Sequence, residues 1–71
     1  MTMPRRESKS YQFIECECAG PTGNSVRIPA GIWPVAEDDI VVTVFVGPNT
    51  RLELSIAAFQ ILKMERRAVP V

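Results

Sequence analysis

Apolar and polar residues alternate over residues 14–18, where Ile and two Cys lie on one face of an extended chain and two Glu lie on the other. This period of two is typical of a half-buried β-strand. Tyr11 and Phe13 begin on the opposite face. Residues 20–24 then supply Gly, Pro and Asn, which favour a turn, and residues 25–28 alternate again. The pattern therefore predicts a first antiparallel hairpin.

The strongest strand pattern covers residues 40–46, which are all β-branched or aromatic. Because apolar residues occur on both faces, we expect a central strand that is covered on both sides. Residues 47–49 read Gly-Pro-Asn and turn the chain, and alternation resumes over residues 52–56. These two segments predict a second antiparallel hairpin.

Between the hairpins, residues 30–39 are expected to be irregular. Pro29 and Pro34 exclude a long helix here. We expect Trp33 and Val35 to cover one end of the core.

The end of the chain allows two interpretations. Ser55 can cap a helix or helical turn over about residues 56–63, which are mostly good helix formers. Ile56, however, also continues the preceding strand pattern, so a strand remains the alternative. Residues 66–71 are expected to form a loose tail, because Pro70 interrupts regular structure.

Together these elements predict a mainly β protein: a small antiparallel sheet or partly open barrel of four to five strands, with one short C-terminal helix or helical turn. A length of 71 residues and 46% hydrophobic residues fit one packed domain. We assign residues 11–65 to this domain and residues 1–10 to a flexible basic arm. No apolar run approaches the roughly 18 residues that cross a bilayer. A cytoplasmic monomer or weak dimer is expected.

Charge is segregated along a chain whose net charge is zero. Residues 1–10 carry a net charge of +2, residues 11–40 carry −4 and residues 41–71 carry +2. An ordinary solvated surface is one explanation. The functional alternative is that the basic ends meet an acidic partner, while the acidic middle repels nucleic acid.

The sequence contains little equipment for catalysis. It has no histidine, which is the commonest general base and metal ligand. Cys16 and Cys18 could begin a zinc site, but a structural site needs four ligands, so we expect two buried, inert thiols. Residues 37–39 read Glu-Asp-Asp and are expected on a solvated loop. The sequence therefore predicts a protein that is not an enzyme, with no catalytic residue, metal or cofactor.

A DNA-binding alternative comes from residues 23–29, which read Gly-Asn-Ser-Val-Arg-Ile-Pro. This segment resembles the signature of the AbrB and MazE type of swapped-hairpin DNA binders. The resemblance implies a dimeric antitoxin or repressor in which Arg27 contacts DNA. Arg27 is the sole basic residue of the acidic segment 11–40, whereas binding to phosphates needs several Lys or Arg. DNA binding is therefore the second hypothesis.

The first hypothesis is a contact with another protein through the N-terminal residues 4–14. This segment combines cations with aromatic residues, and Arg and Tyr are enriched at binding hot spots. The expected partner-binding residues are Arg5, Arg6, Glu7, Lys9, Tyr11 and Phe13. If they do not bind, the pair Arg51 and Glu53 or the basic end at residues 66–67 are the next candidates.

The opening segment Met-Thr-Met-Pro-Arg-Arg-Glu-Ser and the length of the chain resemble the small bacteriophage regulators that bind host RNA polymerase. The resemblance implies a transcription inhibitor and antiterminator of a lytic phage. Such a protein would bind the N-terminal region of the polymerase β′ subunit, displace σ factor from promoter complexes and reduce termination in the host cytoplasm.

Overall fold

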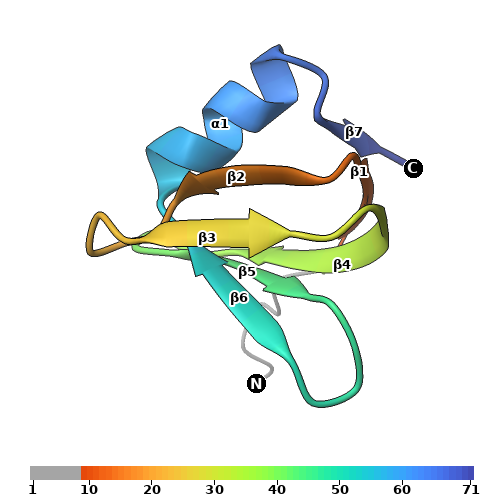
Figure 1. Cartoon of the computed structure of the whole chain (residues 1–71), viewed down its shortest axis with the longest axis horizontal. Coiled ribbons are helices and arrows are strands. Elements are labelled where there is room, and N and C mark those ends of the chain that lie inside the picture. The colour runs from red at the N-terminus through yellow and green to blue at the C-terminus, as the bar shows by residue number, and fades with distance from the viewer. Residues whose placement is uncertain (1–8) are drawn as a thin grey trace, which may run out of the picture.

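A computed structural model describes residues 9–71, and Figure 1 shows the order of their strands and helix. The elements are β1 (Lys9–Phe13), β2 (Cys16–Ala19), β3 (Ser25–Ile28), β4 (Gly31–Glu37), β5 (Val42–Phe45), β6 (Arg51–Leu54), α1 (Ile56–Met64) and β7 (Ala68–Pro70). The helix in this part of the chain lacks the length and apolar character that crossing a membrane requires.

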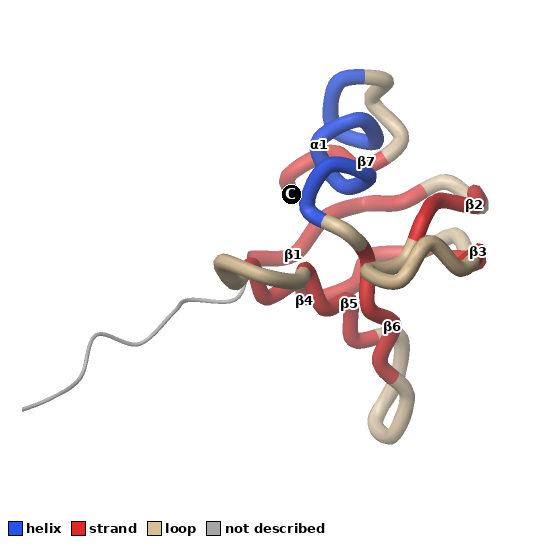
Figure 2. The backbone as a smooth tube through the Cα atoms, turned by 90° about the vertical axis from the view of Figure 1, so that its left-hand side faces the viewer, coloured by secondary structure: helices blue, strands red, loops and turns tan. Residues whose placement is uncertain are grey.

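The described strands form two antiparallel sheets. One has five strands in the order β6-β5-β4-β1-β7, and the other is the β2–β3 hairpin. Figures 1 and 2 show this hairpin between α1 and β6, with β2 nearer the helix and β3 nearer β6. The expected mainly β fold with an antiparallel sheet and one short C-terminal helix is confirmed, and the sheets do not close into a barrel.

Both predicted hairpins are present. In the β2–β3 turn, Gly23 has a φ of 85°, which glycine adopts without steric cost. In the second hairpin, Val42 of β5 lies opposite Leu54 of β6. Strand β5 is shorter than expected, since Ile40 lies outside it and is 83% exposed. Its side chains alternate between buried and half-buried, so only one face is fully covered.

Three aromatic rings form the centre of the core. The Tyr11 ring packs edge-on against Phe59 with their centroids 5.2 Å apart, and the Phe13 centroid is 6.4 Å from each of them. Burial of such rings contributes more than any other contact to the stability of a small core. Aliphatic side chains from five further strands and from α1 complete it: Ile28, Val35, Val42, Val44, Leu54, Leu62 and Ala68.

Helix α1 follows the strand pattern after a one-residue cap. The Ser55 hydroxyl accepts a hydrogen bond from the Ala58 N–H at 3.0 Å, which satisfies one of the free donors at the helix start. Ala58, Phe59 and Leu62 form the buried face. The helical interpretation of this segment is therefore confirmed, and the strand alternative is wrong.

Strand β4 corrects the expectation that residues 30–39 are irregular. Residues 31–35 pair with β1, and β5 pairs only with the later part of β4, from Val35 onward. Pro34 therefore has a strand neighbour on one side only. A proline is tolerated at such a position, because the other side of the strand needs no N–H donor. Val35 is buried in the core as expected, whereas Trp33 is half-buried and its indole N–H donates to the Pro29 carbonyl at 2.8 Å.

The two ends of the domain also differ from the sequence-based expectation. Residues 68–70 are not a loose tail but strand β7, which pairs with β1 as the outermost strand of the sheet. Pro70 is tolerated there because an outermost strand needs no donors on its free side. Lys9 and Ser10, expected in the arm, belong to β1, and the Ser10 carbonyl accepts from the Val71 N–H at 3.1 Å. Residues 1–8 lie outside the described part of the chain.

Candidate protein-binding groove

The predicted N-terminal contact residues divide into three groups. Arg5, Arg6 and Glu7 lie outside the described residues. Lys9 is exposed at the start of β1. Tyr11 and Phe13 are only 5% and 2% exposed, so the expectation that they anchor a partner is wrong. Their aromatic character stabilises the core instead.

The Tyr11 hydroxyl reaches a polar cluster at the edge of the core. It donates to Glu37 Oε2 at 3.5 Å, and the Lys63 ammonium lies 4.0 Å from Glu37 Oε1. The same ammonium lies 4.9 Å from the centroid of the Phe59 ring, within cation–π range. Burial, and next the charge of Glu37, raise the pKa of the Tyr11 phenol. These contacts link Lys63 of α1 to Glu37 of β4 and Glu37 to Tyr11 of β1.

The two cysteines are free thiols on β2. Cys16 is buried and Cys18 is half-buried. Burial raises the pKa of the Cys16 thiol, and burial together with Cys16 raises the pKa of Cys18 to about 11. A raised pKa keeps a thiol protonated near neutral pH, and the thiol is a poor nucleophile and metal ligand. Within residues 9–71, no group of three or more His, Cys, Asp or Glu could hold a metal ion.

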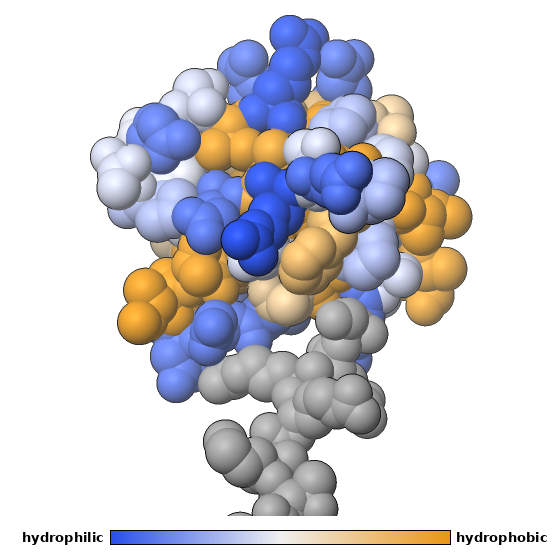
Figure 3. Space-filling view, turned by 90° about the horizontal axis from the view of Figure 1, so that it is seen from below, coloured by the Kyte–Doolittle hydropathy of each residue, from blue (hydrophilic) through white to orange (hydrophobic). Residues whose placement is uncertain are grey.

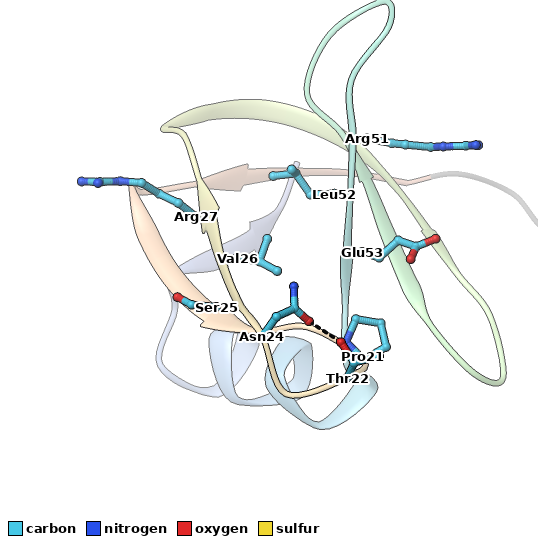
Figure 4. A pocket seen from close by; sticks show the side chains of 9 residues that line it. All are labelled: Pro21, Thr22, Asn24, Ser25, Val26, Arg27, Arg51, Leu52 and Glu53. Carbon is cyan, nitrogen blue, oxygen red and sulfur yellow. Dashed lines mark hydrogen bonds between the residues drawn. The ribbon is translucent and has the colours of Figure 1, made fainter.

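A groove of about 570 Å³ lies between β3 and β6. Figure 4 shows the side chains that line it, which come from the β2–β3 turn, from β3 and from β6. They are Pro21, Thr22, Asn24, Ser25, Val26, Arg27, Arg51, Leu52 and Glu53.

The floor of the groove is apolar. Val26 and Leu52 point toward each other from the two strands, whereas Arg27 and Arg51 point outward on opposite sides (Figure 4). Leu52 is half-buried and packs against the core. Strand alternation explains this arrangement, because neighbouring residues on each strand face opposite sides.

The β2–β3 turn closes one end of the groove with polar groups. The Thr22 hydroxyl donates to Asn24 Oδ1 at 2.9 Å, as the dashed line in Figure 4 marks. Asn24 also packs so closely on Gly20 that a Cβ at Gly20 would collide with its side chain. A glycine is therefore needed at this position to keep Asn24 in place at the end of the groove.

The charges at the groove differ in how they are paired. The Arg27 guanidinium lies 3.1 Å from the Glu15 carboxylate, and both side chains are mostly exposed. Among residues 9–71, no ion pair is made by Arg51 or by Glu53, which lie two positions apart on β6. Arg51 and Glu53 can therefore meet charges on a partner.

Each wall of the groove is a strand with one free side. Within the described residues, β3 pairs only with β2, and β6 pairs only with β5. Charged side chains on such outer strands normally restrain uncontrolled strand pairing. The same exposed backbone is a site where an extended polypeptide can bind.

Figure 3 shows the molecule from below, where apolar side chains are exposed among polar ones. The large exposed apolar side chains lie on several elements and loops: Ile14, Ile32, Ile40, Ile61, Met64, Val69 and Val71. Ile32 of β4 and Val69 of β7 both lie beside Gln12 of β1, and Ile61 and Met64 lie three positions apart on α1. Exposed apolar side chains are common on globular proteins, and we take the groove, which is a depression, as the candidate site.

Sequence reasoning identified part of the groove. It named Arg51 and Glu53 as second-choice contact residues and Arg27 as a DNA contact, and the structure brings all three to one groove. It missed Val26 and Leu52, because alternation places both on a core-facing side. No signal in the sequence shows that the two hairpins meet there.

A scan against models of protein families, a search of curated proteins and a search of solved structures each find no match to this chain. We therefore base the proposed function on the chemistry and geometry of the groove.

Proposed function

We propose that this protein is a non-enzymatic module that binds another protein through the groove between β3 and β6. The observation that supports this proposal is the groove itself. It has an apolar floor, an Arg and a Glu that make no ion pair within residues 9–71, and on each wall a strand with a side left free by the described strands. Arginine beside an apolar depression is typical of protein-binding hot spots. The raised pKa values of both thiols argue against thiol catalysis at neutral pH.

For the partner, we propose bacterial RNA polymerase, with the β′ subunit as the site of contact. This part of the proposal is supported by the resemblance of residues 1–8 to small phage regulators of that enzyme. Arg5, Arg6 and Lys9 supply a further basic contact for an acidic surface. Binding would inhibit initiation by displacing σ factor and would promote antitermination.

The test is a binding measurement between the purified protein and purified bacterial RNA polymerase, combined with a promoter-dependent transcription assay. We expect binding, reduced initiation, and at least about five-fold weaker binding by Arg51→Gln, because loss of a hot-spot arginine costs more than about 1 kcal/mol. Arg66→Gln is the comparison variant, since Arg66 is exposed on the turn after α1 and belongs to the other candidate contact at residues 66–67.

Two results would contradict the proposal in different ways. An absence of binding to the polymerase would remove the polymerase as partner. Equal binding by the parent, Arg51→Gln and Arg66→Gln would remove the groove as the site of contact, and the basic residues near the N-terminus would then be tested by Arg5→Gln with Arg6→Gln.

The DNA-binding hypothesis depends on Arg27. Its guanidinium is held by Glu15 at 3.1 Å, so a DNA phosphate would have to compete with a carboxylate of the same chain. This pairing favours the protein partner. A gel shift with duplex DNA that weakens with salt and disappears in Arg27→Ala would reverse that preference.

A further inference from the structure

We propose that the partner enters the groove as an extended segment and pairs, antiparallel, with the free side of β6. This inference rests on the proposed function, because it specifies how the groove binds a protein. It also specifies the chemistry of the segment: a basic, an apolar and an acidic residue in that order along the partner chain.

The first step concerns the direction of the β6 backbone groups. The Val46 N–H donates to the Thr50 carbonyl at 3.0 Å, which makes these two residues a hydrogen-bonded pair at the end of the β5–β6 hairpin. Hydrogen-bonded and non-hydrogen-bonded pairs alternate along an antiparallel ladder. Arg51 opposite Phe45 is therefore a non-hydrogen-bonded position, and so is Glu53 opposite Thr43. Their N–H and C=O groups point away from β5, to the free side of β6.

An independent hydrogen bond supports this assignment. Ser55 lies two residues beyond Glu53, so its N–H should point to the same side. It does, because it donates to the Ala19 carbonyl of β2 at 3.0 Å. This bond also closes the free side at one end. The open part of β6 therefore consists of Arg51 and Glu53, with two N–H and two C=O groups.

The same reasoning applies to the opposite wall. The Gly20 N–H donates to the Asn24 carbonyl at 2.7 Å, so Ser25 and Arg27 are non-hydrogen-bonded positions relative to β2. Polar backbone groups therefore face the free side of β3 as well. We assign the pairing to β6 because its charged side chains make no ion pair in the described part of the chain, whereas Arg27 is already paired with Glu15.

Side-chain chemistry gives the partner sequence. Directly opposite residues on neighbouring strands interact, and opposite charges stabilise the pair. An acidic residue therefore fits opposite Arg51, an apolar residue fits opposite Leu52 above the apolar floor, and a basic residue fits opposite Glu53. Because antiparallel pairing is the more stable arrangement, the order along the partner chain is basic, apolar, acidic.

A second copy of this chain is a less suitable occupant. The segment Arg51-Leu52-Glu53 would complement itself in an antiparallel pair, since each Arg would meet a Glu. In a second copy, however, β6 carries β5 beside it. The far side of the groove is lined by β3, so a second copy paired along β6 would have to place its own β5 against β3.

The test uses the full chain and the probe peptide acetyl-Thr-Lys-Val-Asp-Thr-amide in an NMR titration of ¹⁵N-labelled protein. We expect shifts concentrated on the amides of Arg51 and Glu53, and slower hydrogen exchange of these two amides at saturation. Methylation of the peptide nitrogens of Lys and Asp should weaken binding at least about five-fold, because these nitrogens donate to β6. Methylation of the last Thr nitrogen is the control, since that N–H points away from β6.

An exchange of the two charges on β6 tests the side-chain assignment. It compares the preference of each variant between two peptides, so it does not depend on the free energy of unfolding of the variant. In the double variant Arg51→Glu with Glu53→Arg, the preferred peptide should become acetyl-Thr-Asp-Val-Lys-Thr-amide. The parent should prefer the original peptide by about five-fold or more. An unchanged preference in the double variant would overturn the proposed pairing.

The remaining outcomes separate this inference from the proposed function. If neither peptide produces shifts at millimolar concentration, while RNA polymerase binds and Arg51→Gln weakens that binding, strand pairing is wrong and the groove remains the binding site. If the Arg51 and Glu53 amides shift with protein concentration alone, the occupant is a second copy and the partner segment is wrong. Peptide binding without polymerase binding supports strand pairing and removes the polymerase as partner.

Discussion

Replacing Phe13 by Leu tests whether the N-terminal aromatic residues belong to the core or to a partner contact. The Phe13 side chain is 2% exposed, and its ring lies 6.4 Å from those of Tyr11 and Phe59. A hydrophobic swap of similar volume costs up to about 1.5 kcal/mol, and loss of the aromatic pairs adds about 0.5–1 kcal/mol. We therefore expect the free energy of unfolding to fall by about 2 kcal/mol, out of the roughly 3–5 kcal/mol typical of so small a core.

Urea unfolding followed by circular dichroism measures this change, with a lower midpoint and an unchanged slope. In a thermal scan, the expected decrease in Tm is roughly 8–16 °C. Ile14→Ala is the matched control, because Ile14 follows Phe13 directly and is 53% exposed. The control should change the free energy of unfolding by less than about 0.5 kcal/mol. If Phe13→Leu left the midpoint unchanged, the assignment of this ring to the core would be refuted.

Three further predictions address the helix cap, the thiols and the first strand. Ser55→Ala should lower the free energy of unfolding by about 1 kcal/mol, because the Ala58 N–H loses its acceptor. Ser55→Asp keeps an acceptor and should retain most of the parent's free energy of unfolding. Equal urea midpoints for the two variants would contradict the cap. The pKa of Cys18 is raised from 9.0 to about 11, so the folded chain keeps this proton after the unfolded chain has lost it. The contribution of Cys18 to the free energy of unfolding should therefore be complete below pH 9 and should be lost as the pH rises toward 11. Urea midpoints should decrease across that range, and they should decrease less in Cys18→Ala. Deletion of residues 1–8 should leave the Tm unchanged, whereas deletion of residues 1–10 should lower it, because Ser10 bonds to Val71 and pairs opposite Pro34; equal Tm values for the two deletions would contradict the observed start of β1.

The hairpins and the helix could be predicted because their determinants are local. Alternation and turn residues define β2–β3 and β5–β6, and a serine followed by good helix formers defines α1. The burial of Tyr11 and Phe13 also had a local signal, since both alternate with the polar residues Ser10 and Gln12. Their position beside a basic segment favoured a binding role instead.

Strands β4 and β7 could not be predicted because each contains a proline. A proline normally interrupts a strand that has neighbours on both sides. Pro34 and Pro70 escape this rule, since each lies where the sheet has a free side. Which side of a strand is free is a property of the whole sheet, and no local pattern contains it.

The groove is the feature that depends most on long-range structure. Alternation correctly places Arg27, Arg51 and Glu53 on the surface, but it says nothing about how the two hairpins meet. The bond from the Ser55 N–H to the Ala19 carbonyl joins β2 to the end of β6, and burial of Val26 and Ile28 in the shared core also holds the two hairpins together. Beyond that bond, no further pairing joins the β2–β3 sheet to β6 within residues 9–71. The edges therefore stay separate along Arg51 and Glu53, and the incomplete closure of the sheets is the physical origin of the groove.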